Sequence, residues 1–174
     1  MAEMFHIPQV LSYLQLEPDM RVAEFGCGAG FFSVALAGRL PRGIVYAIDI
    51  QNHRIERLKS DMRHLGMFHV KAQCRNVEVF GGSGLERDSL DAAVIPNALF
   101  QSENQHGMMQ EAARVLKKGG QLLVVEWVKR NPLRMAMTSA NPLEIKKTAE
   151  LLNLRLRREF HAGDYHVGMI FEKI

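Results

Sequence analysis

Three glycines at alternate positions, Gly26, Gly28 and Gly30, lie between an apolar run at residues 22–25 and a helix-like stretch at residues 31–39. Glycine accepts a left-handed backbone, and because it has no side chain it lets a ligand approach the bare peptide. The first N–H groups of the following helix have no partner inside that helix. A glycine-rich turn between a strand and a helix therefore predicts a binding site for a nucleotide-like ligand.

The spacing of the glycines narrows the choice of ligand. The dinucleotide fingerprint G-x-G-x-x-G would place its third small residue at position 31, which is occupied by Phe31. The third glycine instead comes one residue earlier, at Gly30, and an acid, Glu24, stands two residues before the first glycine. No P-loop lysine follows. The pattern favours a ligand held by close backbone contact, and a structural turn without a ligand is the alternative.

A second acid, Asp49, closes the apolar run at residues 44–48, about 20 residues after the glycines. A carboxylate at this point suits the hydroxyl groups of a ribose. The same side chain could also cap the helix predicted to follow it. Asp49 is therefore predicted to bind the sugar of the ligand.

Two side chains are candidates for a general base at the carboxyl edge of the sheet, where ligands bind in open α/β folds. Glu126 ends the apolar run at residues 121–125, and His106 lies near the start of a predicted helix. Tyr165 and His166 fall in a predicted closing hairpin, where we expect His166 to be structural. The seven histidines lack the paired spacing of metal ligands, so no metal site is predicted.

The stretch from Glu24 to Gly30 resembles motif I of the class I S-adenosylmethionine (SAM) methyltransferases. The run at residues 113–122 resembles the segment before the fifth strand in the same family. The resemblance implies SAM as cofactor and S-adenosylhomocysteine (SAH) as product. It also implies an α/β fold, a Rossmann-like three-layer α/β/α sandwich around a mostly parallel seven-stranded sheet. The implied strand order is 3-2-1-4-5-7-6, with strand 7 antiparallel.

The resemblance also implies which residues hold the cofactor. Asn76 and Val77 would meet the adenine, with Glu78 as the alternative polar partner, and Pro96 and Asn97 would lie at the fourth-strand edge beneath the methyl group. The implied cofactor-binding residues are Glu24, Phe25, Gly26, Cys27, Gly28, Gly30, Asp49, Ile50, Asn76, Val77, Pro96 and Asn97.

Hydrophobic periodicity and turn residues predict the elements that position these side chains. Strands are expected at residues 22–25, 44–48, 68–74, 90–95, 121–125, 154–161 and 166–172, and helices at 4–16, 31–39, 51–65, 102–116 and 142–152. Residues 117–120 are expected to form a turn. Residues 1–20 could form a lid over the cofactor or cover a sheet edge, and residues 129–141 a substrate-side loop or a connector.

Length and composition set the remaining limits. The 174 residues predict one domain over 1–174, and no run approaches the ~20 apolar residues of a membrane span. The first six residues lack the basic and apolar regions of a secretory signal, and the two cysteines lack metal spacing, which predicts free thiols in the cytoplasm. The net charge of +3 is scattered, which weakens the case for a nucleic-acid partner. The oligomeric state is undetermined.

These features predict a SAM-dependent methyltransferase that acts on a small-molecule acceptor. The chain resembles the small bacterial methyltransferases similar to the ubiquinone and menaquinone enzymes, without any feature that selects a quinone. Asn97 is not part of the Asn-Pro-Pro-Tyr motif typical of exocyclic-amine methylation. The alternatives are a non-catalytic SAM-binding protein, an RNA methyltransferase and a nicotinamide-dependent oxidoreductase.

Overall fold

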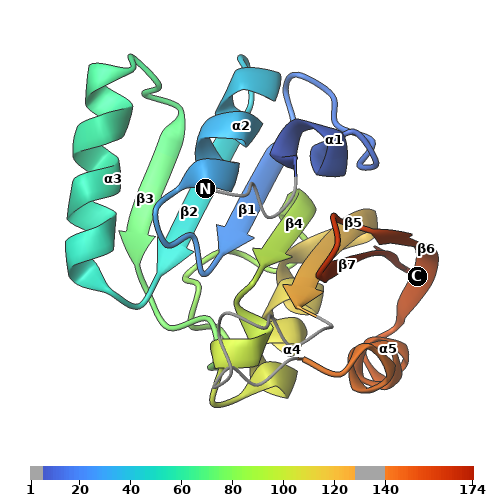
Figure 1. Ribbon diagram of the computed structural model, residues 1–174. Coiled ribbons are helices and arrows are strands. Elements are labelled where there is room, and N and C mark those ends of the chain that lie inside the picture. Colours follow the sequence, from blue (N-terminus) through green and yellow to red (C-terminus); the bar gives the residue numbers. More distant parts are fainter. Residues whose placement is uncertain (1–5, 128–139) are drawn as a thin grey trace.

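The computed structural model of the protein describes residues 6–127 and 140–174, and its centre is a seven-stranded sheet (Figure 1). The sheet has the order β3-β2-β1-β4-β5-β7-β6. β7 runs antiparallel to both of its neighbours, and the other pairs are parallel. The strands are β1 (Arg21–Phe25), β2 (Ile44–Asp49), β3 (Val70–Cys74), β4 (Leu90–Pro96), β5 (Leu116–Trp127), β6 (Leu154–His161) and β7 (His166–Lys173). The predicted strand order is therefore confirmed.

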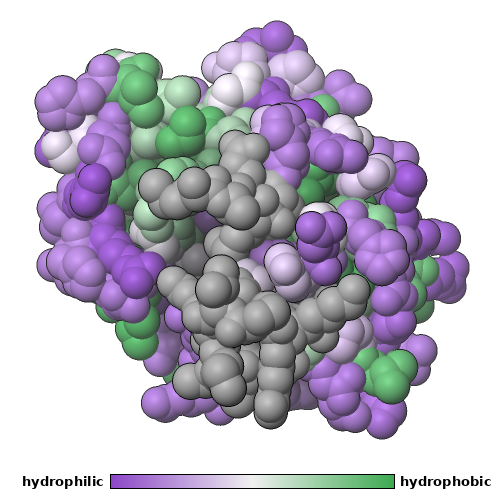
Figure 2. Space-filling model, in the orientation of Figure 1, coloured by the Kyte–Doolittle hydropathy of each residue, from purple (hydrophilic) through white to green (hydrophobic). Residues whose placement is uncertain are grey.

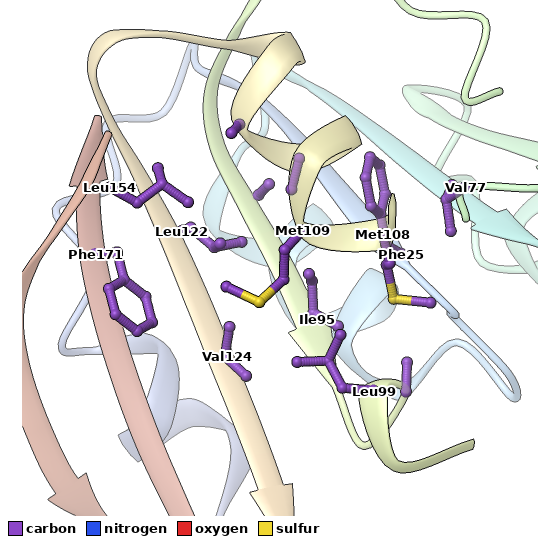
Figure 3. Packing of buried hydrophobic residues seen from close by; sticks show 14 of the residues in the cluster. Phe25, Val77, Ile95, Leu99, Met108, Met109, Leu122, Val124, Leu154 and Phe171 are labelled. Carbon is purple, nitrogen blue, oxygen red and sulfur yellow. The ribbon is translucent and has the colours of Figure 1, made fainter. Parts of the chain in front are cut away.

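Helices cover both faces of the sheet, which confirms the three-layer fold (Figure 1). Successive strand residues point to opposite faces, so Phe25 belongs to the apolar cluster that includes Met108 of α4 (Figure 3), and Val22 belongs to the cluster that includes Leu36 of α2. Because both faces are covered, the central strands are almost continuously apolar. The helices are α1 (Ile7–Leu11), α2 (Phe31–Arg39), α3 (Asn52–His64), α4 (Gln105–Val115) and α5 (Pro142–Leu151), with a 3-10 turn η1 (Leu99–Gln101).

The N-terminal helix is shorter than the predicted 4–16, because α1 ends at Leu11 and the chain turns immediately afterwards. His6 caps the helix: its Nδ1 accepts a hydrogen bond from the N–H of Gln9 at 3.3 Å. Residues 1–5 lie outside the described residues. The role of this segment as a lid stays a prediction.

Two boundaries around α4 differ from the sequence predictions. The helix begins at Gln105 instead of residue 102, because Leu99–Gln101 forms a separate turn and Asn104 supplies the cap by accepting a hydrogen bond from Gly107 N–H at 2.9 Å. The expected turn at 117–120 lies inside β5, since Leu116 already pairs with Leu90 of β4. The extra residues form an irregularity before the regular pairing resumes.

The predicted loop at residues 129–141 falls almost wholly outside the described residues. Within residues 6–127 and 140–174, no helix has the length and apolar character needed to cross a bilayer. The two cysteines are free thiols, and the cytoplasmic compartment stays a prediction. The rim of the face in Figure 2 is mostly hydrophilic, and apolar side chains gather in its upper left part.

Candidate active site

The glycine turn is fastened to the end of β2 and leaves no room for side chains. The N–H groups of Gly26 and Cys27 donate to the carbonyl of Ile48 at 2.8 and 3.0 Å. Gly26 has a φ of +74°, and a Cβ built there would lie 2.7 Å from the Cβ of Ala98. Gly30 has a φ of +79°, and its Cβ would meet a side chain of α3. The turn therefore requires glycine both for its conformation and for the space beside it.

Asp49 joins this turn to the start of α3. Its Oδ2 accepts a hydrogen bond from Gly28 N–H at 2.9 Å, and its Oδ1 accepts one from Gln51 N–H at 2.9 Å. The side chain is 7% exposed. Because each carboxylate oxygen has two lone pairs, both oxygens keep acceptor capacity toward the adjoining cavity. The alternative that Asp49 caps the following helix is wrong, because Gln51 is the N-cap residue of α3 and no side chain of the described residues caps that helix.

A cavity of about 200 Å³ opens beside Asp49. Asn76 Oδ1 accepts a hydrogen bond from Glu78 N–H, and Glu78 Oε2 accepts one from Asn104 N–H, each at 2.9 Å. The structure thus brings the predicted adenine residues and the alternative Glu78 to the same wall. The lining residues are Gly26, Asp49, Ile50, Gln51, Arg54, Arg75, Asn76, Val77, Glu78, Ala98, Gln101, Ser102 and Met108.

A second cavity of about 680 Å³ lies on the other side of Gly26, within the size range of ligand pockets. Its outer wall is apolar and includes Phe31, which is 72% exposed. Gly26, Arg54 and Gln101 line both cavities, so the two form one crevice around the glycine turn. The lining residues are His6, Ile7, Pro8, Glu24, Gly26, Cys27, Gly28, Ala29, Phe31, Phe32, Arg54, Pro96, Asn97 and Gln101.

Glu24 lies at the back of this larger cavity and is 1% exposed. Ser33 of α2 donates a hydrogen bond from its hydroxyl to Glu24 Oε2. Burial raises the pKa of Glu24 to about 8, so the carboxyl group is mostly protonated at neutral pH. Burial also raises the pKa of the Cys27 thiol, so Cys27 is not a nucleophile at neutral pH.

The edge of the larger cavity after β4 holds Pro96 and Asn97, as predicted. Asn97 has a left-handed φ of 52°, and its N–H donates to the carbonyl of Val125 at 2.7 Å. Gln101 Nε2 donates to the Asn97 carbonyl at 2.8 Å. The side-chain Oδ1 of Asn97 is buried and has no hydrogen-bond partner among the described residues. A buried acceptor without a partner is costly, and a donor on a ligand would satisfy it.

Glu126 and His106, the predicted bases, line neither cavity. Glu126 is fully buried beneath η1, and its Oε1 accepts a hydrogen bond from Leu99 N–H at 2.6 Å. Burial raises the pKa of Glu126 to about 8, and its Oε2 has no hydrogen-bond partner among the described residues. His106 lies on the exposed surface of α4. Their roles as bases stay predictions.

Phe25 and Gly30 are the two predicted cofactor residues that line neither cavity. Phe25 is buried in the core, and Gly30 precedes the first residue of α2. Sequence reasoning missed Arg54 and Gln101, which line both cavities. The position of Arg54 in the helix that follows Asp49 was the one signal for it, and nothing in the sequence indicated Gln101. Among the described residues there is no cluster of histidine, cysteine or acidic side chains suited to a metal.

Similar solved structures share the fold of this chain. A SAM-dependent methyltransferase from Aquifex aeolicus superimposes with a TM-score of 0.87, covering 99% of this chain and 92% of that one at 22% identity. Geranyl diphosphate C-methyltransferase from Streptomyces coelicolor superimposes with a TM-score of 0.81 at 13% identity, covering 97% of this chain and 78% of that one. The fold is that of the class I SAM-dependent methyltransferases.

The sequence comparisons identify the family. Residues 16–166 match the methyltransferase domain family, and the chain belongs to it. Squalene methyltransferase 2 of Botryococcus braunii is 30% identical over 127 residues, which are 73% of this chain and 33% of that protein. Ribosomal RNA small subunit methyltransferase C of Acinetobacter baumannii is 27% identical over 122 residues, 67% of this chain and 35% of that protein.

The chain thus spans about a third of the length of these curated relatives. The family resemblance predicted from the glycine motif is confirmed, and SAM is the methyl donor that this family and fold imply. The narrower similarity to ubiquinone and menaquinone methyltransferases stays a prediction.

Proposed function

We propose that this protein transfers a methyl group from SAM to a small-molecule acceptor. The observation that carries the proposal is the crevice around the glycine turn, where a polar cavity containing Asp49 meets a larger apolar cavity at Gly26. The residues present fit the cofactor: the turn excludes a Cβ at Gly26, and the buried Oδ1 of Asn97 requires a donor. The polar cavity is suited to the nucleoside, and the apolar one to the methionine part and the acceptor.

The nucleoside would be held by groups that the fold already orients. Asp49 would accept hydrogen bonds from the ribose hydroxyls, since its two backbone donors leave lone pairs unused. Asn76 and the backbone of Val77 would contact the adenine at the opposite wall. Because these groups are fixed before the ligand arrives, binding costs little reorganisation.

When bound, SAM supplies an electrophilic methyl group on its sulfonium, which an acceptor nucleophile displaces in line. The contribution of the chain is to orient the reactants and to exclude water. Pro96 and Asn97 form the edge where β4 ends, and the Asn97 Oδ1 would accept a hydrogen bond from the amino group of the methionine part. Ile7, Pro8 and Phe31 would shield the acceptor from water.

Glu126 supports this edge from below. Its carboxyl group accepts the Leu99 N–H, and Gln101 in the same turn bonds the Asn97 carbonyl. Because Glu126 lines neither cavity, a positioning role suits its location better than that of a base. His106 has no part in the proposal.

The apolar wall of the larger cavity favours a small apolar acceptor. Two of the related proteins are by name methyltransferases of squalene and of geranyl diphosphate, and another acts by name on ribosomal RNA. Several basic side chains that could serve RNA are engaged in ion pairs, among them Lys117 with Asp91 and Lys146 with Glu159. A small molecule is therefore preferred to RNA. The antiparallel β7 also differs from the 3-2-1-4-5-6 sheet of dinucleotide-binding oxidoreductases.

Calorimetric titration with SAH and with NADH tests the cofactor, and a panel of acceptors with methyl-labelled SAM tests the reaction. We expect SAH to bind, NADH not to bind, and label to enter an apolar acceptor. Absence of SAH binding would overturn the proposal. SAH binding without label transfer to any acceptor would favour the non-catalytic alternative.

A further inference from the structure

Arg54 on α3 is the charged side chain that reaches both parts of the crevice. The guanidinium lies over the glycine turn, since a Cβ built on Gly28 would be 3.0 Å from Arg54 Nη1. The side chain therefore extends from α3 to the point where the two cavities meet.

The acidic side chains that line the crevice accept hydrogen bonds from other groups, and no salt bridge joins any of them to Arg54 within the described residues. Glu24 is bonded by the Ser33 hydroxyl, Asp49 accepts two backbone N–H groups, and Glu78 accepts the N–H of Asn104. Within the described part of the chain, no ion pair or hydrogen bond joins the Arg54 guanidinium to another residue. Its donors are therefore available to a ligand.

Two other arginines show that this arrangement is particular to Arg54. Arg57, on the same helix, lies 3.8 Å from the carboxylate of Asp61 and lines neither cavity. Arg75 lines only the smaller cavity, and its guanidinium packs beside Gly84. Arg54 alone among these three reaches the larger cavity.

The start of α2 adds to the positive potential beside Arg54. The residue preceding α2 is Gly30, which has no side chain to cap the helix, and in the first turn the backbone N–H of Ser33 donates to the buried carboxyl group of Glu24. The first residue of the helix, Phe31, lines the larger cavity. The partial positive charge of a helix N-terminus favours an anion, and here it lies on the same cavity as the guanidinium.

We propose that Arg54 is the anion-binding residue of this site and that its guanidinium holds a carboxylate group where the two cavities meet. A planar guanidinium binds a carboxylate through two parallel hydrogen bonds, which lysine cannot reproduce. The inference rests on the proposed function for the identity of the carboxylate, which belongs either to the methionine part of the cofactor or to the acceptor.

Calorimetry with two adenosyl ligands distinguishes these sources. SAH carries the carboxylate, whereas 5′-methylthioadenosine has the same nucleoside and sulfur without it. We expect Arg54→Gln to weaken SAH binding by about 10- to 100-fold, the worth of hydrogen bonds between charged groups, and to leave methylthioadenosine binding unchanged. Arg54→Lys should recover only part of the loss. Arg57→Gln is the matched control and should bind both ligands as the wild type does.

If the carboxylate belongs to the acceptor, Arg54→Gln should leave SAH binding unchanged and weaken the binding of decanoate to the SAH-saturated protein. Equal behaviour of Arg54→Gln and Arg57→Gln toward SAH and decanoate would overturn the inference. Should the wild type bind neither adenosyl ligand, the proposed function fails, and decanoate titration of the ligand-free variants still tests Arg54. Circular dichroism melting should show both variants folded, since neither side chain is buried.

Discussion

The two cavities on either side of Gly26 are built in different ways. In the smaller one, the polar side chains of Asp49 and Asn76 already accept hydrogen bonds from nearby backbone N–H groups. In the larger one, Asn97 Oδ1 is buried without a partner among the described residues, and Glu24 is mostly neutral. The smaller cavity is thus organised before a ligand binds, whereas the larger one contains a buried acceptor, Asn97 Oδ1, that has no partner among the described residues.

Three buried glutamates differ in pKa because their hydrogen-bond and ion-pair partners differ. Burial opposes the ionisation of Glu111, but hydrogen bonds from Arg114 and Ser83 outweigh it and lower the pKa to about 2. Glu24 and Glu126 lack such a cation, and burial raises the pKa of each to about 8. Glu111 fastens the loop that follows β3, while the two neutral glutamates lie in and beneath the crevice.

The largest expected effect comes from a substitution at Gly26, which lines both cavities. Gly26→Ala should reduce SAH affinity by more than about 100-fold, about 2.7 kcal/mol, because the new Cβ would meet Ala98 at 2.7 Å. Calorimetry measures the loss, and circular dichroism confirms folding. Gly66→Ala is the matched control, since Gly66 has a similar φ of +68° with no atom within 4 Å of its Cβ. An equal loss in the control would attribute the effect to backbone strain.

The role of the smaller cavity in binding the nucleoside is tested by Asp49→Ala. We expect SAH and methylthioadenosine to lose the same affinity, about 1.5–3 kcal/mol, because both ligands carry the ribose and the acceptor is charged. Asp61→Ala, on the exposed surface of α3, is the control in the same titrations. An unchanged dissociation constant would remove Asp49 from the site.

The neutral glutamates predict a dependence of stability on pH. Their pKa values are raised from 4.5 in the unfolded chain to about 8, so the folded state retains protons that the unfolded chain has released. Stability therefore falls as pH rises through this window. The buried His166, whose pKa burial lowers from 6.5 to about 4, has the opposite slope in the lower part of the window.

The fall in the free energy of unfolding should therefore be clearest between about pH 7 and pH 8. Glu126→Gln should make the free energy of unfolding less dependent on pH, because the amide oxygen can still accept the Leu99 N–H. Urea unfolding at a series of pH values measures this slope. The exposed Glu56→Gln should leave the slope as it is in the wild type, and an unaltered slope in Glu126→Gln would show that Glu126 is not its source.

The smallest expected effect on ligand binding comes from a substitution at Asn97 in the larger cavity. Asn97→Ala should weaken SAH binding by about 0.5–1.5 kcal/mol, the worth of one ordinary hydrogen bond, and should spare methylthioadenosine, which lacks the amino-acid part of SAH. Asn153→Ala controls for backbone strain, because Asn153 has a comparable φ of 57° and lines neither cavity. If both ligands weaken equally, the division of the crevice into two sides is wrong.

Much of the smaller cavity could be predicted because its determinants are local. The glycines follow a short apolar strand, Asp49 ends a second one, and Asn76 comes shortly after the more polar β3. The carboxyl ends of parallel strands meet at one edge of the sheet. The strand order itself came from the family resemblance, because periodicity alone cannot order the strands. The helix at 31–39 was predicted at its observed boundaries, since the glycine turn before it and the turn after it are both marked in the sequence.

Residue types and spacing determined most of the strands and helices, the position of the glycine turn and which acid ends β2. Only the tertiary structure decided that Glu126 is buried beneath Leu99, 27 residues away, and that Arg54 lies over Gly28. The start of α4 at Gln105 was likewise decided by the packing of η1. These features depend on contacts between separate elements, and burial and side-chain reach exist only once those elements have packed together.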